Sequence, residues 1–140
     1  MKLLPNSNDP LIIRTDFSDD GVWQEVCSRI SAPLEDWGMV YYANVTFLSD
    51  SAFQDTTKTQ LLNALTEEHE HSFLCIADCV TISHMENPIL VVDLFEEFGR
   101  EFRALPEAIQ GIENNLSISN MDLRDFADSV DSDGIFREFA

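Results

Sequence analysis

The stretch SFLCIADCVTISHMENPILVVDLF, at residues 72–95, constrains the fold of this chain more than any other. It contains two nearly continuous apolar runs, at residues 73–77 and 89–92, and an aspartate follows each run. Apolar runs of this length without polar alternation are typical of strands covered on both faces, as in a mostly parallel sheet between helices. The stretch therefore predicts two central strands of an α/β sheet.

The rest of the chain alternates between strand patterns and helix patterns. The predicted strands are at residues 11–16, 44–50, 73–77, 89–92 and 100–105, and helices are expected to begin near residues 18, 57, 106 and 120. This alternation, ending in a hairpin, predicts a three-layer α/β/α sandwich of about five strands, mostly parallel, with an antiparallel edge hairpin.

Two segments fall outside this alternation. Residues 1–10 are rich in Pro and Asn, so we expect an irregular N-terminal arm, followed by a single α/β domain at residues 11–140. A connection that contains Trp37, Tyr41 and Tyr42 is expected to lay its aromatic rings over an edge of the sheet.

The chain is strongly acidic. It has 8 Lys plus Arg and 26 Asp plus Glu, which gives a net charge of −18. A field of this sign repels phosphate groups, which proteins bind mainly through Lys and Arg. The charge therefore argues against nucleic acid and anionic membranes as partners, and it favours a basic protein or a cation.

The cysteines and the apolar segments indicate a compartment. Cys27, Cys75 and Cys79 are odd in number and have no CxxC spacing, which is typical of reduced thiols. No apolar run approaches the roughly 18 residues of a membrane span. The first residues also have too short an apolar patch for a secretory signal. We therefore expect a cytoplasmic protein.

Aspartates end four of the predicted strands and are the candidate catalytic and metal-binding residues: Asp16, Asp50, Asp78 and Asp93. If these strands are parallel, their carboxyl ends share one edge, where open α/β sheets bind ligands. Neighbouring strands lie about 4.8 Å apart, so adjacent carboxylates could share one Mg²⁺. Aspartate also forms turns and helix caps at strand ends. No Lys or Arg obviously joins the four to bind a phosphate, which favours the turn-forming role.

A block of amides and hydroxyls near the C-terminus is the second candidate site. It comprises Asn114, Asn115, Ser117, Ser119 and Asn120. Such side chains satisfy the exposed polar groups at helix ends, and they also form binding surfaces on loops. The pattern does not separate these two roles.

Several blocks of the sequence together resemble a known family. They are RTDFSDD at residues 14–20, the pair Ala77-Asp78, ENPILVVDL at 86–94, IENNLSISNMD at 112–122 and DGIFR at 133–137. In these blocks the chain is similar to a family of small acidic microbial and fungal domains of unknown function. The resemblance extends over nearly the whole chain and implies one domain, but it implies no activity, cofactor or catalytic residue.

The sequence thus favours a binding protein over an enzyme. We expect a non-enzymatic interaction domain, similar in charge to inhibitor and immunity proteins, that binds a basic protein and needs no cofactor. The alternative is a divalent-metal-dependent hydrolase or phosphoryl-transfer enzyme, in which Asp16, Asp78 and Asp93 are catalytic and Mg²⁺ is the cofactor.

Overall fold

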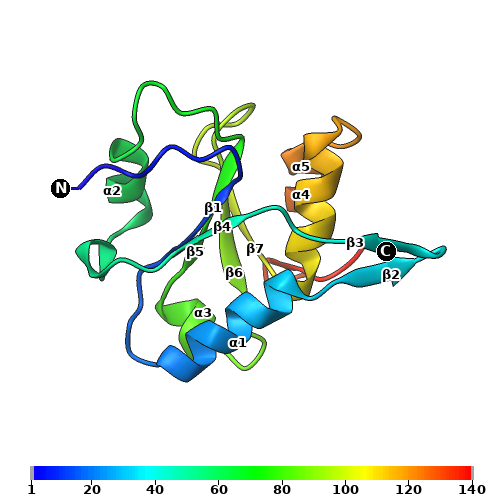
Figure 1. Ribbon diagram of the computed structural model, residues 1–140, viewed down its shortest axis with the longest axis horizontal. Helices are drawn as coiled ribbons and strands as arrows, with labels where there is room; N and C mark the ends of the chain where they lie inside the picture. The colour runs from blue at the N-terminus through cyan, green and yellow to red at the C-terminus, as the bar shows by residue number, and fades with distance from the viewer. Residues whose placement is uncertain (1, 140) are drawn as a thin grey trace.

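The computed structural model describes residues 2–139, and its centre is a six-stranded sheet between two layers of helices (Figure 1). The order across the sheet is β4-β1-β5-β6-β7-β8. The strands of this sheet are β1 (Leu11–Arg14), β4 (Thr46–Leu48), β5 (Phe73–Ala77), β6 (Ile89–Asp93), β7 (Glu101–Ala104) and β8 (Ile135–Phe136). The α-helices are α1 (Asp20–Ser31), α2 (Lys58–Asn63), α3 (Cys79–Ser83), α4 (Ile109–Ser117) and α5 (Leu123–Ala127). Short 3₁₀ turns lie at η1 (Ser51–Phe53) and η2 (Pro106–Ala108).

Most strands of the sheet run in one direction. β1 is parallel to β4 and β5, and β7 is parallel to β8, whereas β6 is antiparallel to both of its neighbours. This confirms the mostly parallel α/β fold with a β6–β7 hairpin. β7 is not the edge, however, because the two-residue strand β8 pairs beyond it. Two residues are too few to show a strand pattern in a sequence.

Successive side chains of the central strands belong to two different hydrophobic cores, one on each face of the sheet. Ile12 belongs to the core cluster that includes buried residues of α1, α4 and α5, whereas Ile13 belongs to the cluster that includes Phe53 and Leu61 of α2. Both isoleucines are fully buried. Figure 1 shows α2 on one side of the sheet and α4 and α5 on the other. Burial on both faces explains why the apolar runs show no alternation.

A separate two-stranded hairpin projects from this body (Figure 1). It consists of β2 (Leu34–Asp36) and β3 (Met39–Tyr41), which pair antiparallel. Trp37 at its tip is 95% exposed, so the expectation that the aromatic rings of this segment cover a sheet edge is wrong. The turn places Trp37 at φ +52° and Gly38 at φ +73°, as two-residue hairpin turns require. For a residue other than glycine, this left-handed conformation costs about 1–2 kcal/mol.

The N-terminal residues 2–10 contain neither helix nor strand, but they are fixed to the body. Leu4 is buried, and its backbone N–H donates to the carbonyl of Ala64 at 2.8 Å. Within residues 2–139, no helix has the length and hydropathy to cross a membrane.

Removing one methyl group from either core tests whether the sheet is covered on both faces. We expect Ile12→Val and Ile13→Val each to lower the free energy of unfolding by about 0.5–1.5 kcal/mol, measured by urea denaturation. Ile118→Val makes the same chemical change at a 73% exposed site and should have little effect. A sheet with one solvated face would make one of the two core variants as neutral as this control.

Candidate functional site

The reversed direction of β6 separates the four candidate aspartates. Asp16, Asp50 and Asp78 follow the parallel strands β1, β4 and β5 and lie toward one edge of the sheet. Asp93 ends the antiparallel strand β6, and its register partner is Phe73, the first residue of β5. The expectation that all four carboxylates share one edge is therefore wrong for Asp93.

All four carboxylates accept hydrogen bonds from nearby backbone groups. Asp16 accepts from the N–H of Ser18 at 2.8 Å, and Asp50 accepts from the N–H of Ala52 at 2.9 Å. The buried Asp93 accepts from the N–H groups two and four residues later, at 2.8 and 3.0 Å. Within the part of the chain that the structure describes, no three His, Cys, Asp or Glu side chains are arranged to hold a metal ion.

Asp78 has the most developed set of contacts. It caps α3 by accepting from the N–H of Thr81 at 3.1 Å, and it forms a two-pronged ion pair with Nη1 and Nη2 of Arg103 at 3.0 and 2.7 Å. Burial alone would raise the pKa of the Asp78 carboxyl group. The hydrogen bonds from Arg103 and Thr81 outweigh burial, so the pKa lies below its usual range.

The block of amides and hydroxyls lies at and beyond the C-terminal end of α4. Asn115 and Asn120 close this end: the N–H of Asn120 donates to the carbonyl of Asn115 at 2.9 Å, and their side chains are joined at 2.8 Å. Asn114 instead reaches the carbonyl of Tyr42, after the hairpin, at 2.8 Å. Ser117 and Ser119 each line a hollow beside α4.

Three neighbouring hollows are lined by residues of α4, and together we call them the α4 face. The acidic hollow, of about 350 Å³, lies between the α4–α5 connection and the end of β6. The hairpin groove, of about 470 Å³, lies between α4 and the β2–β3 hairpin. The third hollow, of about 300 Å³, is lined by residues 8–10 and by Glu113. Residues shared between the linings make the three hollows neighbours.

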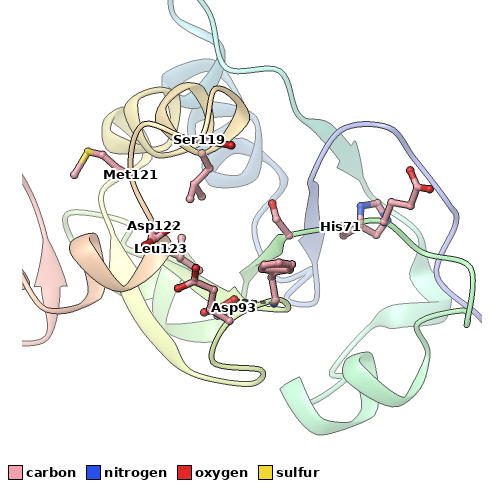
Figure 2. A pocket seen from close by; sticks show the side chains of 11 residues that line it. His71, Asp93, Ser119, Met121, Asp122 and Leu123 are labelled. Atoms are coloured by element: carbon pink, nitrogen blue, oxygen red, sulfur yellow. Dashed lines mark hydrogen bonds between the residues drawn. The ribbon is translucent and has the colours of Figure 1, made fainter.

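The acidic hollow combines carboxylates with an apolar wall. In Figure 2, Asp122 and Leu123 face it from the α4–α5 side and Asp93 from the sheet. Glu96 also lines it, and burial together with the nearby Asp122 carboxylate raises the pKa of Glu96. The Asp122 contribution shows that the two carboxylates repel each other across this hollow.

Glu113 is a buried carboxylate held by amides. Only 4% of the residue is exposed, and its Oε1 accepts from the backbone N–H of Asn44 at 2.7 Å, from Asn44 Nδ2 at 2.9 Å and from Asn114 Nδ2 at 2.8 Å. Within residues 2–139, no protein hydrogen bond reaches its Oε2. Because a carboxylate only accepts hydrogen bonds, the amide nitrogens of Asn44 and Asn114 must point toward Glu113.

The hairpin groove is lined by both apolar and polar side chains. Leu34 and Tyr41 of the hairpin and Ile118 beyond α4 are the large apolar residues of the lining, and Asp36 contributes a carboxylate. Amide side chains make up much of the polar part, namely Asn44, Gln110, Asn114 and Asn115.

Sequence reasoning missed both Glu113 and the groove. The hairpin was hidden because Trp37 occupies a turn position where Asn or Gly is expected. The role of Glu113 depends on Asn44, 69 residues earlier in the chain, and no local pattern shows such a contact. The pair Trp37-Gly38 between short apolar runs was the one local signal of the hairpin.

The Asp78–Arg103 pair predicts a pH-dependent contribution to stability. Because the folded pKa of Asp78 is lowered, this contribution is present above the unfolded pKa of about 3.9 and is lost as the pH falls through the folded value. Asp78→Asn should lower the free energy of unfolding by about 1–3 kcal/mol at pH 7, and this difference from wild type should shrink below about pH 4. Urea denaturation across this pH range measures it.

Asp128→Asn is the control, because it breaks the exposed ion pair between Arg100 and Asp128. We expect a clearly smaller loss of stability from this variant. A difference between wild type and Asp78→Asn that stayed constant down to pH 2.5 would contradict the assignment.

The arrangement of the carboxylates, in which no three acidic, His or Cys side chains of residues 2–139 are placed to hold a metal ion, also predicts the response to divalent cations. Mg²⁺ and Mn²⁺ at millimolar concentration should raise Tm no more than monovalent salt at matched ionic strength, because screening alone relieves repulsion in so acidic a chain. Thermal unfolding measures this. An excess that the double variant Asp16→Asn, Asp78→Asn abolished would instead establish a metal site at the carboxyl edge.

Comparison with known families agrees with the resemblance seen in the sequence. Residues 9–139 match the model of a family described as Domain of unknown function (DUF6924). No functionally curated protein matches the chain. Because the match covers most of its length, the chain belongs to the DUF6924 family, a family of domains of unknown function.

Proposed function

We propose that this protein is a non-enzymatic interaction module, comparable to an inhibitor or immunity protein, that binds a basic protein partner through the α4 face. The observation that carries the proposal is the distribution of charge. Each of the eight Lys and Arg side chains lies within 4.0 Å of a carboxylate of the same chain. The net charge of −18 is therefore carried by carboxylates in excess of these pairs.

The α4 face carries part of this excess. Its three hollows are lined by the carboxylates of Asp9, Asp36, Glu70, Asp93, Glu96, Glu113 and Asp122. Among the described residues, no Lys or Arg lines any of these hollows. Such a surface attracts cationic groups and repels phosphates, which supports a basic protein as the partner.

The hairpin segment beside this face also offers apolar contact area. Trp37, Met39 and Tyr42 of the hairpin segment are each more than half exposed. Exposed apolar groups beside polar rims are typical of surfaces that bind other proteins. Charge would speed the encounter, and these apolar groups would supply contact area in the complex.

A cytoplasmic location is part of the proposal. Cys27, Cys75 and Cys79 are free thiols in the structure. Burial raises the pKa of Cys27 to about 11, and burial also raises the pKa of Cys75 above its usual range, so neither thiol is prepared for nucleophilic chemistry. Free, unreactive thiols suit a reducing compartment.

Affinity capture with two variants of equal charge tests the proposal. The first variant neutralises Asp9, Asp36 and Glu70 on the α4 face by Asp→Asn and Glu→Gln changes, and the control neutralises Glu25, Asp55 and Glu138 elsewhere. Each protein is immobilised and exposed to a lysate of the organism that encodes it, and the bound proteins are identified by mass spectrometry.

Wild type and control should enrich the same basic protein, and the α4-face variant should lose it. With that purified partner, raising the salt from about 50 to 500 mM should slow association by about tenfold or more, because screening removes the steering field. Enrichment that fell equally in both variants, or no basic protein bound to wild type, would overturn the proposal.

A further inference from the structure

We propose that the hairpin groove binds an arginine side chain on an exposed segment of the basic partner. This inference rests on the proposed function and assigns the partner's chemistry to one of the three hollows. At about 470 Å³, the groove has the size of a typical ligand site, about 300–1,000 Å³. The α-helix α4 forms one of its sides and the projecting hairpin forms the other.

Several hydrogen-bond acceptors in the groove have no partner among the described residues of the protein. Nδ2 of Asn114 donates to Tyr42 and Glu113, Nδ2 of Asn115 donates to the carbonyl of Gly111, and Nε2 of Gln110 donates to Asn114. Each of these amide nitrogens therefore uses at least one of its two N–H groups inside the protein, and Asn114 uses both.

Asn44 also donates hydrogen bonds inside the protein. Its backbone N–H and its Nδ2 both donate to the buried Glu113. Across residues 2–139, protein hydrogen bonds reach neither Oδ1 of Asn44, nor Oε1 of Gln110, nor the Asp36 carboxylate. A ligand with several N–H donors and a positive charge complements these acceptors, and a guanidinium group has five N–H donors.

The apolar walls suit the remainder of an arginine side chain. Leu34 and Ile118 are 51% and 73% exposed, so they are available to pack against the methylene stem. Tyr41 lines the groove, and Trp37 stands at the tip of the same hairpin. A guanidinium stacks on aromatic faces, whereas the compact ammonium of lysine makes fewer fixed hydrogen bonds.

The negative charge of the hairpin favours a basic partner over a second copy of this chain as the occupant of the groove. The hairpin carries Glu35 and Asp36, and each copy has a net charge of −18. Two copies meeting at their hairpins would bring like charges together, which opposes association. A basic partner meets the same surface with the opposite sign.

The test is an NMR titration of the full chain with a defined probe at about 150 mM salt. The probe is the peptide acetyl-Ser-Arg-Leu-Arg-Ser-amide, and its control replaces both arginines by citrulline, which is neutral and nearly the same shape. The arginine peptide should shift the indole N–H of Trp37 and the side-chain amides of Gln110 and Asn114. The buried indole of Trp23 should not shift, and the citrulline peptide should bind at least about tenfold more weakly.

Two adjacent carboxylates provide the matched control for charge. Asp36 lines the groove, whereas Glu35 precedes it on the strand and points to the other face of the hairpin. Asp36→Asn should weaken binding about two- to fivefold, because the Asp36 carboxylate contacts the guanidinium directly. Glu35→Gln should weaken binding by less than about twofold, because Glu35 makes no direct contact and salt screens its charge. Trp37→Asn should also weaken binding about two- to fivefold. Its Tm should not fall, because Asn tolerates the turn conformation better than Trp.

Four results would overturn the groove assignment. The first is that Asp36→Asn and Glu35→Gln weaken peptide binding equally, and the second is that the peptide shifts only NMR signals of residues in the acidic hollow. The third is that NMR signals of the hairpin change with protein concentration in the absence of peptide. The fourth is that the arginine peptide shifts no signal at millimolar concentration. The first two would leave the proposed function standing with another binding surface. The third would assign the hairpin to a second copy of the chain. The capture experiment tests the proposed function independently of all four.

Discussion

The scarcity of positive charge governs how this chain is held together. Eight basic side chains face 26 carboxylates, and several of the eight connect segments that are far apart in the sequence. Arg137 pairs with Glu86 at 2.7 Å across 51 residues, and Arg29 pairs with Glu107. Single exposed ion pairs contribute little to stability, but here every one also reduces a repulsion that acts on the whole chain. The cations are therefore committed to the fold, and the remaining carboxylates set the surface character.

The reversal of β6 assigns different roles to the two edges of the sheet. Toward the carboxyl edge, Asp16, Asp50 and Asp78 cap turns and helices, and Arg103 compensates Asp78. Toward the opposite edge, Asp93 fixes the β6–β7 turn beside the acidic hollow. Open parallel sheets usually bind ligands at their carboxyl edge. In this fold the aspartates of the carboxyl edge make structural contacts, and three neighbouring hollows lie around α4 instead.

The sequence predicted the features that depend on long local patterns. The runs at residues 73–77 and 89–92 identified the central strands because burial on both faces removes polar alternation over five residues. The direction of β6 left no such mark, because strands buried in either direction have the same composition. The expectation that Trp37 covers a sheet edge is wrong because Trp37 lies in the hairpin turn, in a left-handed conformation that Asn or Gly usually adopts. The sequence does not indicate the role of Glu113, because its partner Asn44 comes from the other half of the chain.

In the proposed interaction, the arrangement around Glu113 would distinguish recognition of one partner from general electrostatic attraction. A net charge of −18 attracts any basic protein at a distance, and such attraction by itself does not select one partner. Selection requires polar groups whose positions are fixed before binding, because an unmatched ligand then leaves them without partners. Glu113 accepts from the backbone N–H and the side-chain amide of Asn44 and from the side-chain amide of Asn114, which fixes the orientation of the Asn44 amide in the groove lining. A single buried carboxylate thus links the packing of α4 to the polarity of the groove beside it.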